Sequence, residues 1–168
     1  MSIEVSEYVN VKERALKLGC NVPAELAILP RNFESAEAKH ELIHEDSAPT
    51  VRILFREAGL VETKIEKEGD KFPYAQEKAF QWIGPIIFVS PLLLSQNPHA
   101  LSVAIGVISN YLTDWFKGIP GRKKVKLSIV VEQSTEHISK RIDYEGEIEG
   151  LKELLLIVQE VQSQWTPE

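Results

Sequence analysis

The chain has 168 residues, a net charge of −6 and an apolar fraction of 43%, which together fit one globular domain over 1–168. No stretch approaches about 18 uninterrupted apolar residues, so no membrane span is expected, and the acidic balance disfavours nucleic acid as a partner. A single cysteine, Cys20, excludes an internal disulfide. With no secretory signal at the N-terminus, this cysteine usage fits a cytoplasmic protein.

The N-terminal part, 1–49, shows the least regular pattern. Apolar residues recur at helical spacing over 6–18, which predicts a helix. A short apolar run at 24–29 lies between two prolines and favours a strand, although the pattern leaves open whether 20–30 is strand or helix. One further helical segment is expected near 35–44.

The middle of the chain predicts one helix and two strands. Thr50 is a good helix cap and precedes apolar residues at helical spacing, so a helix is expected over 50–59. Residues 61–67 alternate and predict a strand. Residues 85–90 are almost continuously apolar, which is typical of a central strand buried on both faces.

The C-terminal half has the clearest pattern. Asn97-Pro98 is a strong helix start, and the apolar stripe that follows predicts one long helix over 97–117. Period-two alternation over 125–132 and 138–144 predicts two strands that form a C-terminal β-hairpin. A last amphipathic helix is expected over 147–164.

These elements predict a mixed α/β (α+β) fold. We expect a single-layer mixed sheet of about four or five strands, packed by three or four helices. The predicted hairpin makes the sheet at least partly antiparallel.

The string His40-Glu41-Leu42-Ile43-His44 matches the spacing H-E-x-x-H. In a helix this spacing puts both imidazoles on one face, where they can hold Zn²⁺ while the glutamate activates a water. Over these five residues the chain resembles the zincin metallopeptidases. The resemblance implies His40 and His44 as zinc ligands and Glu41 as general base.

The residues around this string favour a different interpretation. Lys39 precedes it, Glu45-Asp46 follow it, and Pro49 cuts short any helix. The pattern therefore predicts a charged, solvated helix end, with the zinc site as the alternative. Cys20 is interpreted as a small buried hydrophobe rather than a nucleophile.

A basic cluster, Arg122-Lys123-Lys124 with Lys126, follows two glycines, Gly118 and Gly121, but lacks the spacing of a phosphate-binding loop. It is interpreted as a solvated turn.

No catalytic residue, cofactor or complete metal site is predicted. The preferred hypothesis is a small non-catalytic protein that binds a protein partner or itself, as a homodimer or an obligate complex through a helical face at 97–117 or 147–165. The alternative is a zinc-dependent hydrolase that uses His40, Glu41 and His44.

Overall fold

The computed structural model describes residues 1–76, 81–121 and 123–165. Its strands are β1 (Ser2–Tyr8), β2 (Leu26–Leu29), β3 (Gln81–Val89), β4 (Lys124–Glu132) and β5 (Ser139–Gly146). They form one five-stranded sheet in the order β1-β5-β4-β3-β2. The pair β3–β4 is parallel, and the pairs β1–β5, β4–β5 and β2–β3 are antiparallel. The predicted fold class, mixed α/β with one mixed sheet, is confirmed.

Five α-helices lie in the described parts of the chain: α1 (Val11–Leu18), α2 (Ala48–Glu57), α3 (Pro91–Gln96), α4 (Ala100–Trp115) and α5 (Glu153–Trp165). Two 3₁₀ turns accompany them, η1 (Lys39–Glu41) and η2 (Ile148–Lys152). None of these helices combines the length and apolarity that crossing a bilayer requires.

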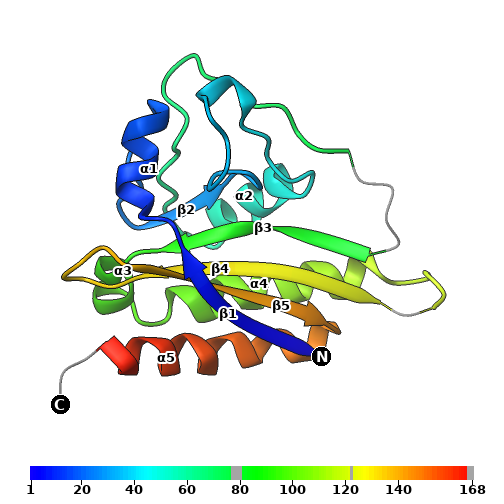
Figure 1. Cartoon of the computed structure of the whole chain (residues 1–168). Coiled ribbons are helices and arrows are strands. Elements are labelled where there is room, and N and C mark those ends of the chain that lie inside the picture. The colour runs from blue at the N-terminus through cyan, green and yellow to red at the C-terminus, as the bar shows by residue number, and fades with distance from the viewer. Residues whose placement is uncertain (77–80, 122, 166–168) are drawn as a thin grey trace.

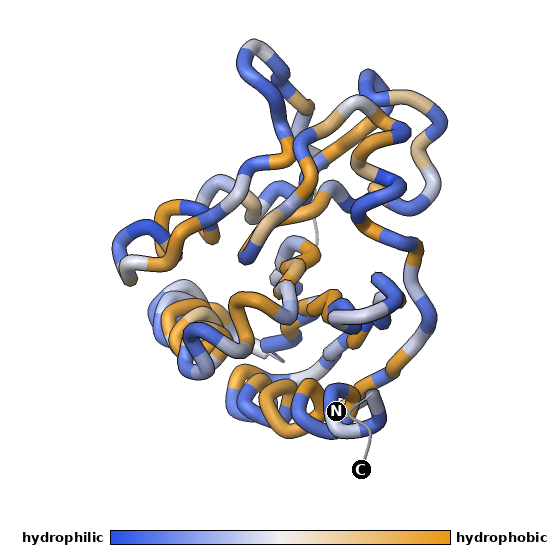
Figure 2. Tube along the Cα trace, turned by 90° about the vertical axis from the view of Figure 1, so that its left-hand side faces the viewer, coloured by the Kyte–Doolittle hydropathy of each residue, from blue (hydrophilic) through white to orange (hydrophobic). Residues whose placement is uncertain are grey.

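One face of the sheet is covered by α2, α4 and α5, whose apolar stripes meet inward-facing residues of β2 to β5 in one core. In Figure 1, α4 and α5 run beneath the sheet, and the tube in Figure 2 shows their orange, apolar positions alternating with blue ones. This side of the molecule follows the predicted helical faces closely. An exception is Trp115, which the stripe placed inside and which is 40% exposed.

The opposite face is covered over only part of its width. A second core joins α1 and the irregular segments 30–46 and 61–75 to β2, β3 and Val130 of β4. Cys20 belongs to this core, as predicted, and burial raises the pKa of its thiol. The rest of this face, over β4, β5 and β1, is polar and open to solvent.

One predicted strand needs correction. The sheet does have five strands, but β1 takes the place of the strand expected at 61–67. In the 61–67 segment only Glu62 forms a bridge, to Leu26. The side chain of Asn21 donates instead to the carbonyls of Lys64 and Glu66, so this backbone is satisfied without a ladder.

The expected helix over 6–18 is shorter than predicted and begins at Val11, because Ser2–Tyr8 is strand. Asn10 caps the helix: its side chain accepts from the Glu13 amide at 3.0 Å. Gly19 ends it with φ of 74°, a left-handed conformation that suits glycine.

The long helix expected over 97–117 is α4, which begins at Ala100 instead of at Asn97-Pro98, and a separate short helix, α3, precedes it. Ser90 caps α3, accepting from the Leu93 amide at 3.1 Å, and Asn97 ends α3 instead of starting the next helix. The helical segment expected near 35–44 is reduced to the single 3₁₀ turn at Lys39–Glu41.

Candidate functional site

The H-E-x-x-H string does not lie in a helix. His40 and Glu41 are exposed on the 3₁₀ turn, and the Glu41 carboxylate accepts from the amides of Glu37 and Ala38 at 2.8 and 3.2 Å. The backbone is extended at Leu42, with φ of −65° and ψ of 134°. His44 is buried beyond that point. The chain therefore lacks the helical geometry that would put both imidazoles on one face.

His44 is buried, with 1% of its surface exposed. Its backbone bridges to the 71–75 segment, donating to Pro73 and accepting from Ala75 at 2.9 and 2.8 Å. Its ring lies 5.6 Å from that of Phe72 and 5.9 Å from that of Tyr74, nearly parallel to the latter at 26°. Among the described residues, no group of three or more histidine, cysteine or acidic side chains is placed to hold a metal ion.

A chain of charged side chains leads from His44 toward the surface. His44 Nε2 lies 3.0 Å from Glu66 Oε1, and Arg52 Nη2 lies 3.0 Å from the same oxygen. Arg52 Nε donates to Glu62 Oε2 at 2.9 Å. The three charged side chains are only 12–15% exposed, so they pair in a partly desolvated setting. We call His44, Arg52, Glu62 and Glu66 the ionic network.

In the ionic network the pKa values of the two carboxylates shift in opposite directions. Burial alone would raise the pKa of Glu66, but hydrogen bonds from His44 and Arg52 outweigh it and lower that pKa to about 2. At Glu62, burial outweighs the Arg52 charge and raises the pKa. Burial lowers the pKa of Arg52 less than its two carboxylate partners raise it.

One atom of the network has no partner. His44 Nδ1 is buried and makes no hydrogen bond to any described residue. Since Nε2 faces a carboxylate, which only accepts, the proton of this hydrogen bond is on Nε2. The imidazole is thus held by one hydrogen bond and two aromatic neighbours.

An open groove of about 700 Å³ adjoins the ionic network. We call it the α2 groove. It is lined by Pro49, Arg52, Ile53, Arg56, Gly59, Leu60, Val61, Glu62, Lys64 and Tyr74. Arg52 and Tyr74 also line a second depression of about 600 Å³ over His44 and Phe72, so the two adjoin each other.

The α2 groove exposes large apolar side chains. Ile53 is 47% exposed, Val61 74% and Tyr74 48%, although they come from three separate segments. Isolated exposed apolar residues are ordinary, but three that line one concave surface make a contiguous patch.

The groove is also more basic than the chain as a whole. Three cationic side chains line it against one carboxylate, whereas the whole chain carries a net charge of −6. Arg52 is committed to the ionic network. Neither Arg56 nor Lys64 takes part in an ion pair among the described residues.

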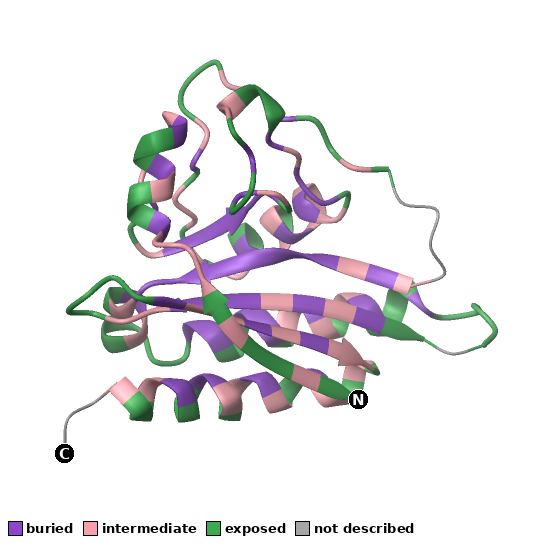
Figure 3. Ribbon diagram, in the orientation of Figure 1, coloured by how far each residue is buried: buried purple, intermediate pink, exposed green. Residues whose placement is uncertain are grey.

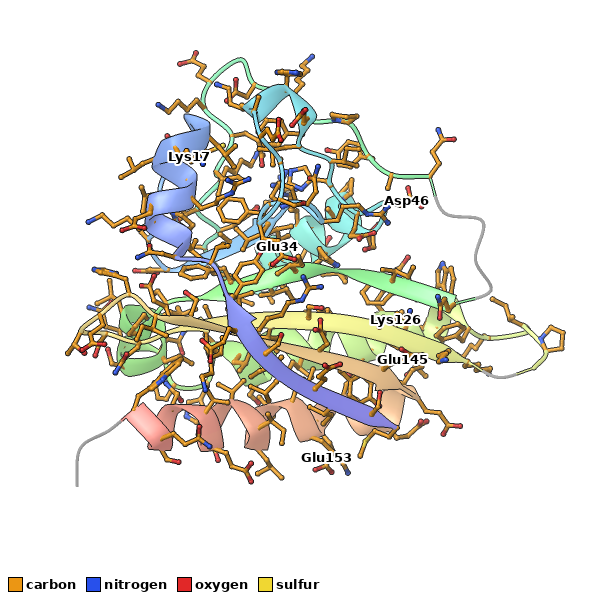
Figure 4. The ribbon with its side chains drawn as sticks, in the orientation of Figure 1. Lys17, Glu34, Asp46, Lys126, Glu145 and Glu153 are labelled. Carbon is orange, nitrogen blue, oxygen red and sulfur yellow. The ribbon has the colours of Figure 1, made fainter. Side chains whose placement is uncertain are left out.

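A second concave surface, on the open face of the sheet, has a different character. Its charged side chains are largely paired: Arg31 with Glu45, Arg141 with Asp143, and Lys124 and Lys126 with Glu145. Figure 4 shows Lys126 and Glu145 on neighbouring strands of this face. Such pairing is typical of a solvated sheet face. Of the predicted basic cluster, Arg122 lies outside the described residues.

Comparison with family models, curated proteins and solved structures finds no match for this chain.

Of the sequence-predicted site residues, the groove region contains His44 alone. The H-E-x-x-H spacing drew attention to His44, but the helical geometry that it predicted is wrong. The sequence analysis missed Arg52, Glu62 and Glu66 altogether. A signal was present in the alternation of 61–67, since period two puts Glu62, Lys64 and Glu66 on one side of an extended segment.

Proposed function

We propose that this chain is a protein-binding module without catalytic chemistry, and that the α2 groove holds a partner segment combining apolar side chains with carboxylates. The observation that carries this proposal is the groove composition: exposed Ile53, Val61 and Tyr74 beside two cations, Arg56 and Lys64, that lack an ion pair among the described residues. A segment with acidic and apolar side chains would cover the apolar side chains of the groove and pair with Arg56 and Lys64.

The surroundings of His44 and Glu66, two groups that could transfer protons in a reaction, support binding rather than catalysis. The His44 side chain is 2% exposed and is hydrogen-bonded to Glu66, whose low pKa keeps it ionised. His44 and Glu66 line the depression beside the α2 groove, but each is hydrogen-bonded within the ionic network, His44 to Glu66 and Glu66 also to Arg52. This arrangement is suited to holding the wall of the groove in place.

The expected affinity is modest. Covering three half-exposed apolar side chains contributes roughly 3–5 kcal/mol before the losses on association. Exposed cations add mainly to the rate of encounter and to specificity. We therefore expect short segments to bind weakly, and binding to weaken as salt is added.

The test uses random dodecapeptides displayed on phage, selected in parallel on the wild-type protein and on Ile53→Asp. Peptides recovered by the wild type alone are expected to be rich in Asp or Glu with Leu, Phe or Trp. A synthetic peptide of that kind should bind Ile53→Asp and Arg56→Glu at least about tenfold more weakly, which corresponds to about 1.4 kcal/mol.

The matched control is Leu16→Asp, a change at a residue that is 61% exposed on α1. It should bind the peptide as the wild type does. Ile53 is itself half exposed, so its variant should fold, and an unchanged melting temperature verifies this. Selection of basic peptides, or of peptides that bind wild type and Ile53→Asp equally, would overturn the proposal.

A further inference from the structure

Strand β1 forms an open edge of the sheet. It pairs with β5 on one side, in a continuous register from Ser2–Glu145 to Tyr8–Ser139, and stands last in the strand order. In Figure 3 its residues are exposed or intermediate along the whole strand, in contrast to the buried β3. Every other residue of a seven-residue edge strand directs its amide and carbonyl outward.

The opposite edge of the sheet is protected. Strand β2 has four residues, all buried, and the 61–66 segment covers it, with the Thr63 amide donating to the Leu26 carbonyl at 2.7 Å. Strand β1 contains no proline and no lysine, and its pairing with β5 has no bulge, so of the common protective features it keeps only two charged side chains. Its two carboxylates, Glu4 and Glu7, lie on opposite faces of the strand.

We propose that β1 pairs antiparallel with β1 of a second copy, joining two five-stranded sheets across a two-fold axis at Val5. The axis is perpendicular to the sheet, so residues on the same face oppose one another and the possible registers are those centred on a residue. In the Val5-centred register all seven residues of β1 find a partner.

Charge and the number of paired residues together select this register. Centring on Val5 places Val5 against Val5, Glu4 against Ser6, and Ile3 against Glu7, so no two carboxylates face each other. Centring on Glu4 would oppose Glu4 with Glu4, and like charges directly opposite destabilise a sheet. Centring on Ser6 would pair only five of the seven residues and set Val5 against Glu7.

The proposed dimer has two further consequences, one for the exposure of Val5 and one for the effect of salt. Val5 is 43% exposed in the single chain and would be covered at the two-fold axis. Each copy carries a net charge of −6, so the copies repel at long range and added salt should strengthen the dimer. This is the opposite of the salt dependence expected for peptides in the α2 groove, so failure of either proposal can be recognised separately.

Sedimentation velocity of the wild-type protein at micromolar concentration is expected to show a dimer of about twice the chain mass of 19.0 kDa. Val5→Lys puts two ammonium groups directly opposite each other and should give a monomer. Leu16→Lys, a matched change at an exposed apolar residue on α1, should leave the dimer intact. A monomeric wild type, or a Val5→Lys variant that remains dimeric, would overturn the proposal.

Cross-linking tests the register without relying on a disruptive variant. Directly opposed residues of an antiparallel pair have Cα atoms about 4.5–5.5 Å apart, which a disulfide can span. In a Cys20→Ala background, Val5→Cys should therefore form a covalent dimer on mild oxidation, and Glu4→Cys should not. Preferential cross-linking of Glu4→Cys, or none at either position, would refute a two-fold axis at Val5.

Discussion

Replacing Arg52 by Met removes the cation that two buried carboxylates share. The substitution keeps most of the aliphatic volume, so the change is chiefly electrostatic. Glu62 and Glu66 are each 12% exposed and would remain in place without that partner. Breaking a partly buried pair from one side costs about 3–5 kcal/mol, because the remaining charge stays desolvated. We expect a loss of that order at neutral pH.

The pH dependence of this loss follows from the two carboxylates. The pKa of Glu66 falls from 4.5 to about 2 on folding, so its ionised form favours the folded state above pH 4.5, and this contribution is lost as the pH falls toward about 2. At about 1.4 kcal/mol per pH unit, the contribution is at most about 3 kcal/mol. The raised pKa of Glu62 has the opposite sign and offsets part of it.

Without Arg52 the folded-state pKa values of both carboxylates should rise. The stabilisation from Glu66 shrinks and the penalty at Glu62 grows, and both effects are largest where the carboxylates are ionised in the unfolded chain. The variant should therefore be least stable, relative to wild type, at neutral pH, and the difference should narrow below pH 4.5.

Urea unfolding of wild type and variant, repeated from neutral pH down to about pH 3, measures this difference. The matched control is Arg56→Met, on the same helix, because Arg56 is exposed and makes no ion pair with a described residue. Its unfolding free energy should change by no more than about 0.5 kcal/mol. A deficit for Arg52→Met that stays constant from neutral pH to pH 3 would refute the electrostatic account.

Two further predictions concern packing and metal binding. A Cβ on Gly84 would lie 2.6 Å from Trp82 Cζ3 and 2.7 Å from Leu127 Cδ1, so Gly84→Ala should cost about 1–3 kcal/mol in urea unfolding. Gly106→Ala, in α4 with nothing within 4 Å, should stabilise by about 0.5–1 kcal/mol, and equal effects would contradict the packing argument. Protein purified without an affinity tag should carry no stoichiometric zinc, because His40 and His44 do not share a helix face. Near one equivalent by elemental analysis, lost in His44→Ala, would restore the hydrolase hypothesis.

The sequence predicts best those elements that bury one stripe against the sheet. Helix α4 and strand β4 match their predicted ranges closely, since a single apolar period runs through each. The same reasoning failed at 61–67, where alternation was present but the backbone hydrogen-bonds to Asn21 instead of a strand. Strand β1 was missed, and its last residues, 6–8, were assigned to the helix expected over 6–18.

The ionic network could not be predicted in the same way. Its members come from three separate segments between residues 44 and 66, and no fixed spacing links Arg52 to the carboxylates it joins. His44 was singled out by a motif, but a motif specifies geometry only when its helix forms. Here the helix ends after one 3₁₀ turn, and the chain beyond it carries His44 into the core.

The position of the ionic network accounts for the shape of the α2 groove. One wall is the exposed side of α2, with Ile53 and Arg56, and the other is the irregular segment that carries Val61 and Lys64. That segment has no strand ladder to fix it, and Arg52 ties it to α2 through two carboxylates. Directional ion pairs position a wall more strictly than apolar contact does, because they fix an orientation as well as a distance. Loss of Arg52 should thus widen the groove as well as destabilise the fold, and peptide affinity should fall in Arg52→Met even under conditions where the variant is fully folded.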